Sequence, residues 1–161
     1  MGGLCFSCEN ARGLTVDRIL LIEDDPEVAQ VVQLCLESKN YMVISTMSGE
    51  KGLKWLEGPE KPALVICDIG LPDMNGLDLC KKVKSDMNLR KIPVIMLTGR
   101  TDNASRLTAG TDSKANLYLT KPVEFDDLIR AVETLIARHK EEQSLLKGIY
   151  IKKFNFQNPK S

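Results

Sequence analysis

The sequence predicts an α/β fold in which a parallel sheet carries helices on both faces. Five short apolar segments alternate with longer stretches that have the residue spacing of helices. Three of the apolar segments are nearly continuous, as expected for strands that are buried on both faces. At 161 residues, with 43% hydrophobic and 27% charged residues, the chain can form one domain with a substantial core.

Each expected strand is followed by an expected helix. The strands are Arg18–Ile22, Tyr41–Ser45, Ala63–Cys67, Pro93–Leu97 and Asn116–Leu119. The helices are residues 26–38, 48–57, 75–86, 102–112 and 124–140. Pro26 and Ser48 are favourable residues at the start of the first two helices. The last helix has the clearest apolar stripe, formed by Phe125, Leu128, Ile129, Val132, Leu135 and Ile136. This alternation favours right-handed crossovers between parallel strands.

Charge and cysteine content exclude several classes of protein. Lys and Arg total 22, as do Asp and Glu, so the net charge does not favour nucleic acid or anionic lipid as a partner. No apolar run reaches the roughly 18 residues of a membrane span, and the N-terminus lacks the pattern of a secretory signal. Five cysteines, an odd number, are typical of reduced thiols in the cytoplasm. Cys5 and Cys8 form a CxxC without a second pair, which we interpret as a fortuitous spacing.

Polar residues stand at the carboxyl ends of four of the expected strands. Glu23 and Asp24 follow the first strand, Asp68 the third, Thr98 the fourth and Lys121 the fifth. Because parallel strands end at the same edge of a sheet, these side chains are expected to meet in one crevice. Three carboxylates there would repel each other by roughly 4 kcal/mol per pair at about 4 Å, and Mg²⁺ would remove this conflict. A cation, a lysine and an Asp nucleophile together would suit a phosphoryl group.

Four motifs carry a resemblance to a known family. They are IEDDPEV at 22–28, CDIGLPDMNG at 67–76, MLTGR at 96–100 and YLTKP at 118–122. With these motifs, residues 17–140 resemble the receiver domain of two-component response regulators. The resemblance implies a doubly wound, flavodoxin-like fold with five parallel strands in the order 2-1-3-4-5, flanked by five helices. Lys114 falls where this family frequently has Gly.

The resemblance also implies a role for each residue of the crevice. Asp68 would be the phospho-acceptor, supplied by the phosphohistidine of a sensor kinase or phosphotransfer protein, and Lys121 would contact the phosphoryl oxygens. A cis peptide bond is expected between Lys121 and Pro122. Thr98 and Tyr118 would form the switch that alters the face built from the fourth helix, fifth strand and fifth helix. The Mg²⁺ ligands would be Glu23, Asp24, Asp68 and the backbone carbonyl of Gly70, while Gly70 and Arg100 would govern access of water to the phosphoryl group.

We expect no enzymatic activity beyond the protein's own phosphorylation and dephosphorylation. A Mg²⁺-dependent phosphohydrolase of the haloacid-dehalogenase type usually has a second acid two residues after its nucleophile, where this chain has Gly70. The remaining alternative is a pseudo-receiver, which binds proteins without phosphotransfer. The output partner is expected to be another protein, and a homodimer through the switch face or the C-terminal tail is a further possibility.

Both ends of the chain lie outside the resemblance. Residues 1–16 are expected to form an irregular arm. Residues 141–161 are expected to continue the last helix through Leu145 and Leu146, and then to form a β-like or irregular tail after Gly148. The only histidine, His139, is expected to be an exposed cation near the C-terminus of the last helix.

Overall fold

A computed structural model of the chain describes residues 7–9, 15–99 and 114–157. Five parallel strands form the sheet: β2 (Thr15–Ile22), β3 (Met42–Thr46), β4 (Leu64–Asp68), β5 (Val94–Thr98) and β6 (Leu117–Thr120). Their order in space is β3-β2-β4-β5-β6, which confirms the expected 2-1-3-4-5 order of the parallel strands. Strands β3 to β6 each lie one residue later than expected, because sheet pairing continues onto the polar residue that closes the strand.

A sixth strand corrects the expectation of an irregular N-terminal arm. β1 (Ser7–Glu9) pairs antiparallel with the first residues of β2, in the register Ser7↔Asp17 and Glu9↔Thr15. β2 is therefore longer than expected at its amino end, beyond the part that pairs with β3 and β4. Sequence pattern did not reveal β1, because a three-residue strand is defined by its backbone partner and is too short to show a periodicity.

The described part of the chain has four helices, and they cover both faces of the sheet. They are α1 (Pro26–Glu37), α2 (Gly49–Glu57), α3 (Gly76–Ser85) and α5 (Phe125–Gln157). The first three begin at side chains that accept hydrogen bonds from the first backbone N–H groups, namely Asp25, Ser48 and Asn75. The helix expected at 102–112 and the residue Arg100 lie outside the described residues. No helix in the described segments is long and apolar enough to span a membrane.

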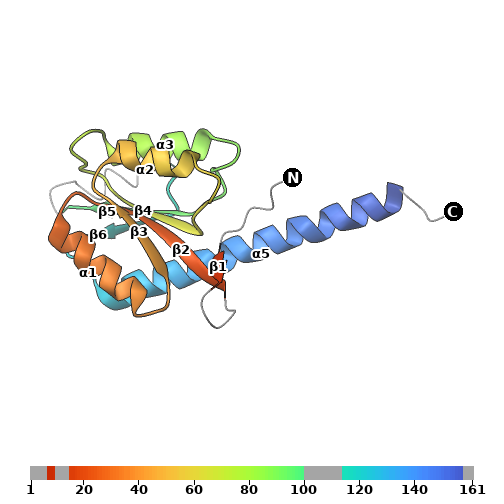
Figure 1. Ribbon diagram of the computed structural model, residues 1–161, viewed down its shortest axis with the longest axis horizontal. Coiled ribbons are helices and arrows are strands. Elements are labelled where there is room, and N and C mark those ends of the chain that lie inside the picture. Colours follow the sequence, from red (N-terminus) through yellow and green to blue (C-terminus); the bar gives the residue numbers. More distant parts are fainter. Residues whose placement is uncertain (1–6, 10–14, 100–113, 158–161) are drawn as a thin grey trace.

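Alternation along the strands divides the core into two layers. Ile19 and Leu21 of β2 face α1 and α5, while Leu20 and Ile22 face α2 and α3. β4 and β5 alternate in the same way and are fully buried over their length, as befits the middle strands of a parallel sheet. Figure 1 shows the resulting three layers, with α2 and α3 on one side of the sheet and α1 and α5 on the other.

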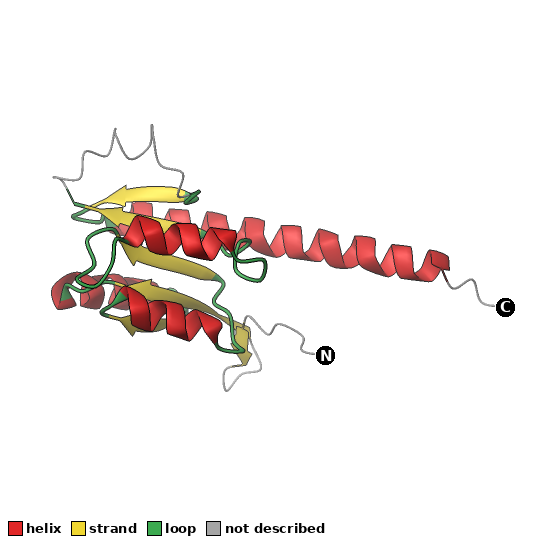
Figure 2. Ribbon diagram, turned by 90° about the horizontal axis from the view of Figure 1, so that it is seen from above, coloured by secondary structure: helices red, strands yellow, loops and turns green. Residues whose placement is uncertain are grey.

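Helix α5 corrects the expectation of a β-like C-terminal tail. It runs without interruption for 33 residues, through the IYIKKFNF segment to Gln157, and extends well beyond the sheet (Figures 1 and 2). Adding a residue to an existing helix needs no new nucleus, whereas a strand needs a partner strand. The local alternation of apolar residues is therefore overridden, and Leu145, Leu146 and Ile149 are exposed on the extension.

His139 also differs from expectation. The helix continues for many residues past it, and its side chain is only 6% exposed rather than solvated. Burial lowers the pKa of the imidazole, while Glu142 opposes this shift. Cys35, Cys67 and Cys80 are buried, and none of these three forms a disulfide. The side chains of Cys5 and Cys8 lie outside the described part of the chain.

Lys114, just before β6, adopts a left-handed backbone conformation with φ of 56°. Only glycine adopts this region without a steric penalty from Cβ. Lys114 therefore carries a backbone strain that a glycine at this position would avoid.

Candidate functional site

The carboxyl end of β2 supplies the first two acidic side chains. Glu23 is fully buried, and its Oε1 accepts a hydrogen bond from the backbone N–H of Asp25 at 3.1 Å. Its own N–H donates to the carbonyl of Thr46 at 3.0 Å, which holds the residue against the end of β3. Asp24 is half-buried beside it, and Asp25 turns away to cap α1. Strand end and helix cap together fix the direction of both acidic side chains.

Asp68 is the last residue of β4 and is 5% exposed. The next N–H, that of Ile69, donates to the carbonyl of Leu97 on β5 at 3.1 Å. The loop then returns so closely that a Cβ on Gly76 would lie 2.0 Å from the carbonyl oxygen of Asp68. Position 76 therefore requires glycine, and the close approach holds the backbone that carries the Asp68 carboxylate.

Lys121 follows β6 and provides the positive charge of the site. Its Nζ lies 2.7 Å from Oε2 of Glu23 and 3.0 Å from Oδ1 of Asp68. Its backbone N–H donates to the carbonyl of Thr98 at 2.7 Å, and the Lys121–Pro122 peptide bond is cis, as expected. Burial opposes the charge of the ammonium, but the two carboxylates outweigh burial and raise the pKa of Lys121.

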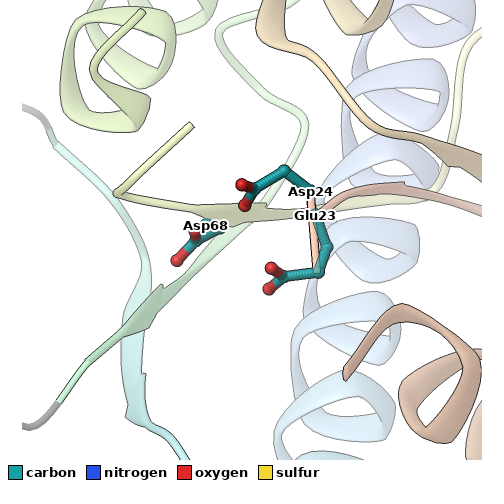
Figure 3. A group of neighbouring side chains, drawn as sticks. All are labelled: Glu23, Asp24 and Asp68. Carbon is teal, nitrogen blue, oxygen red and sulfur yellow. The ribbon is translucent and has the colours of Figure 1, made fainter. Parts of the chain in front are cut away.

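Three carboxylates gather beside this lysine. Glu23, Asp24 and Asp68 each offer an oxygen, and these oxygens lie within 4.8 Å of one another (Figure 3). Burial raises the pKa of Glu23, and the negative charge of Asp68 adds to the shift, while Lys121 and the N–H of Asp25 oppose it. Oxygen ligands in such a group are those that Mg²⁺ prefers, so the chemistry of the cluster fits the expected cation.

Gly70 lies beside the carboxylate of Asp68. A Cβ at this position would stand 3.6 Å from Oδ2 of Asp68, an ordinary contact distance. Gly70 is exposed and forms an isolated antiparallel bridge with Asn75 across the β4–α3 loop. Because position 70 has no side chain, nothing from this residue covers the Asp68 carboxylate.

Thr98 and Tyr118 lie on the neighbouring strands. Thr98 is 1% exposed, and its hydroxyl has no hydrogen-bond partner among the residues that the structure describes. A buried hydroxyl without a partner is costly in free energy. Tyr118 pairs with Met96 in the register of β5 and β6, and its half-buried ring packs on the α2–α3 side of the core.

One residue of the site region was not found from the sequence. Asp73, in the loop between β4 and α3, reaches across to the N-terminus of α2, where its two oxygens accept hydrogen bonds from the N–H groups of Gly49 and Glu50. In the sequence it stands in a Pro-Asp-Met-Asn-Gly turn and has no feature that separates it from an ordinary turn residue. Its partners are more than twenty residues away, so only the folded chain reveals the contact.

Comparison with known proteins agrees with this geometry. The family model "Response regulator receiver domain" matches residues 19–133. The chain is 35% identical over 121 residues to the "DNA-binding dual master transcriptional regulator RpaA" of a Synechocystis strain. This alignment covers 75% of this chain and 49% of RpaA. It is 30% identical over 142 residues to "Response regulator ArlR" of Staphylococcus saprophyticus, covering 87% of this chain and 62% of that protein. The chain therefore spans about half to three fifths of the length of these relatives.

Solved structures give the same result. A response regulator receiver domain protein from Clostridium thermocellum superposes with a TM-score of 0.69 at 30% identity, covering 78% of this chain and 98% of that one. A receiver domain protein described as CheY-like, from Methanospirillum hungatei, superposes with a TM-score of 0.70 at 28% identity, covering 79% and 98%. The acidic cluster, the lysine beside it and the matched family model lead to one conclusion: this chain belongs to the response regulator receiver domain family of two-component signalling.

Proposed function

We propose that Asp68 accepts a phosphoryl group from a phosphohistidine of a sensor kinase or phosphotransfer protein. A carboxylate oxygen of Asp68 forms a bond to phosphorus as the bond between phosphorus and the imidazole nitrogen breaks. The histidine ring, protonated by solvent on its other nitrogen, keeps the electron pair of the broken bond and leaves as a neutral imidazole, while Asp68 becomes an acyl phosphate. The observation that carries this proposal is the pairing of buried Asp68 with Lys121 at 3.0 Å, beside a group of carboxylates that suits a divalent cation.

The residues of this chain hold the reacting groups in place. Lys121 keeps its positive charge next to the oxygen that reacts and can then contact the phosphoryl oxygens. Asp24, Asp68 and the carbonyl of Gly70 would hold Mg²⁺ directly, and Glu23 would act through water. Bound Mg²⁺ would supply charge neutralisation for the phosphoryl oxygens. Because the phosphoryl group is transferred to the protein itself, we propose that the protein has no separate small-molecule substrate and is a switch that acts only on its own phosphorylation state.

The output is proposed to depend on Thr98 and Tyr118. The buried hydroxyl of Thr98 can donate to a phosphoryl oxygen, which would give it the partner that it lacks among the described residues. Movement of Thr98 towards the phosphoryl group would leave space that the half-buried ring of Tyr118 can enter. The equilibrium of the face around β6 and α5 would then shift, and a downstream protein would bind the shifted form.

Two further features of the proposal concern partners and place. RpaA is described as DNA-binding, but this chain spans about half of RpaA, and we propose that this segment acts through protein contacts in the cytoplasm. A second copy of the chain is a further proposed partner, through the β6–α5 face or through the α5 extension with its exposed Leu145, Leu146 and Ile149. Sedimentation velocity at rising concentration tests the second copy, and a constant monomer would contradict it.

Intact-protein mass after incubation with acetyl phosphate tests the proposed function. The parent protein is expected to gain one phosphoryl group in the presence of Mg²⁺ and none with a chelator. Asp68→Asn removes the nucleophile and is expected to show no gain. Failure of the parent to gain mass over a full time course, together with no response to beryllofluoride and Mg²⁺, would contradict the proposal and favour a phosphorylation-independent binding module.

A further inference from the structure

We propose that Asp73 is a positioning residue for the Mg²⁺ site, because it ties the loop that carries Gly70 to the N-terminus of α2. The inference rests on the proposed function, and it deepens it. The Mg²⁺ ligands come from two separate places, the end of β2 and the loop after β4. Asp73 is a link between them, because its two carboxylate oxygens accept hydrogen bonds from α2 and are not part of the acidic cluster.

The contact is a cap supplied from a distant part of the chain. Oδ1 of Asp73 accepts from the N–H of Gly49 at 2.9 Å, and Oδ2 accepts from the N–H of Glu50 at 2.8 Å. The first N–H groups of a helix have no partner within the helix. The local cap, Ser48, accepts only from Lys51, at 3.4 Å. The two backbone hydrogen bonds lower the pKa of Asp73, so the carboxylate is ionised at neutral pH, where it also complements the helix dipole.

Apolar packing next to Asp73 joins the same two segments. A Cβ on Gly49 would lie 2.6 Å from Sδ of Met74, so the side chain of Met74 in the loop packs directly against the first turn of α2. The loop base is closed independently, by the Gly70–Asn75 bridge and by a hydrogen bond from the N–H of Gly76 to the carbonyl of Ile69 at 2.8 Å. Asp73 and Met74 hold the loop tip.

Helix α2 is in turn fixed to the strand that carries Glu23 and Asp24. A Cβ on Gly52 would lie 2.4 Å from Cδ1 of Ile22, the residue just before Glu23. Leu56, one turn further along α2, is fully buried in the same cluster as Ile22. A continuous path therefore runs from the Gly70 loop through Asp73 and α2 to the end of β2.

This link is expected to affect Mg²⁺ more than folding. Mg²⁺ demands near-octahedral ligands at about 2.0–2.1 Å, so a small displacement of the loop weakens binding. Asp73 is exposed, and loss of a helix N-cap typically costs about 1 kcal/mol, which leaves the protein folded. A purely structural cap would show the same loss of stability without any change in Mg²⁺ affinity.

Asp86 offers a matched control within the same chain. Its Oδ1 also accepts two backbone hydrogen bonds, from Asn88 at 2.7 Å and Leu89 at 3.2 Å, and it is exposed. It closes a local turn just after the C-terminus of α3, whereas Asp73 caps the N-terminus of α2 from the loop that precedes α3. Asp86→Ala therefore removes an exposed carboxylate with two backbone hydrogen bonds that does not join the Gly70 loop to α2.

The experiment measures the dissociation constant for Mg²⁺ by calorimetry in the parent, Asp73→Ala, Asp73→Asn and Asp86→Ala, with urea unfolding of each. Asp73→Ala is expected to weaken Mg²⁺ roughly three- to tenfold. Asp73→Asn should fall between it and the parent, because one acceptor oxygen remains. Asp86→Ala should stay within about twofold of the parent.

The outcomes separate the two proposals. If the parent binds Mg²⁺ and Asp73→Ala binds it equally well, or if Asp86→Ala weakens it by the same factor, the positioning role is wrong and the proposed function stands. If the parent itself fails to bind Mg²⁺, the proposed function is wrong, and the inference falls with it. Both Asp73 variants are surface changes, and the unfolding curves establish that any loss of affinity occurs in folded protein.

Discussion

Replacing Lys121 by Met is expected to destabilise the protein far more than its single charge would suggest at the surface. The ammonium lies 2.7 Å from Glu23, which is fully buried, and 3.0 Å from Asp68, which is nearly so. Removing one partner of a buried ion pair leaves uncompensated charge, which typically costs about 3–5 kcal/mol. Two effects reduce this cost. The side chain of Lys121 is 21% exposed, so water already screens part of the ion pair. Burial already raises the pKa of Glu23, so this carboxyl can take up a proton when the lysine is removed. We therefore expect a decrease of about 2–3 kcal/mol in the free energy of unfolding at neutral pH.

Lys140 provides the control for this measurement. It pairs with Asp17 at the same distance, 2.7 Å, but 55% of its side chain is exposed. Lys140→Met is expected to cost less than about 1 kcal/mol. The assay is urea unfolding of both variants in a chelator, repeated with saturating Mg²⁺. The cation should recover more stability in Lys121→Met than in the parent, because it replaces the missing positive charge. Equal losses in the two variants, or no difference in the recovery by Mg²⁺, would refute the assignment of Lys121 to a buried acidic site.

Three further outcomes are expected. Thr98→Val removes a buried hydroxyl that lacks a partner among the described residues, so the free energy of unfolding in a chelator should change by less than about 1 kcal/mol. The change in protein fluorescence on addition of beryllofluoride should become smaller, and a full response would contradict the switch role. Gly76→Ala places a Cβ 2.0 Å from the carbonyl oxygen of Asp68 and should lower the free energy of unfolding in urea by more than about 2 kcal/mol. Gly148→Ala has open space around it and should only raise the helicity measured by circular dichroism. Equal effects of the two substitutions would refute the close approach at Gly76. The pKa of His139 in the folded protein lies below its unfolded value of 6.5, so the unfolded chain binds the proton more tightly, and the free energy of unfolding should decline as the pH falls from about 7 towards 5. His139→Gln should remove this part of the pH dependence, and an unchanged profile in the variant would contradict the buried neutral imidazole.

The sequence was sufficient for the fold class, the order of the parallel strands and most of the site. Short, nearly continuous apolar runs favour strands buried on both faces, and their alternation with helical segments favours a parallel sheet whose strands end at one edge. Acidic residues, a hydroxyl and a lysine after these strands are then expected to meet. The structure brings Glu23, Asp24, Asp68, Thr98 and Lys121 to that edge, with Gly70 beside Asp68.

Tertiary structure decided the features whose partners are remote or whose local pattern is ambiguous. β1 exists because β2 offers it a backbone edge, and three residues carry no period of their own. The segment after Gly148 alternates like a strand, yet continues α5, because an established helix extends without a new nucleus. His139 lies in a run of charged residues that suggests exposure, and only the packed helix shows it to be buried.

Asp73 shows both what can be predicted from the sequence and what cannot. Its own segment predicts a turn, and a turn is what forms, but its two acceptor oxygens are satisfied by a helix that begins more than twenty residues earlier. Hydrophobic period and the residues that follow each strand are local properties, so the sheet and the residues at its edge could be predicted from the sequence. Hydrogen bonds between distant segments depend on how complete elements pack together, so the contact that holds the loop of the site is visible only in the folded chain.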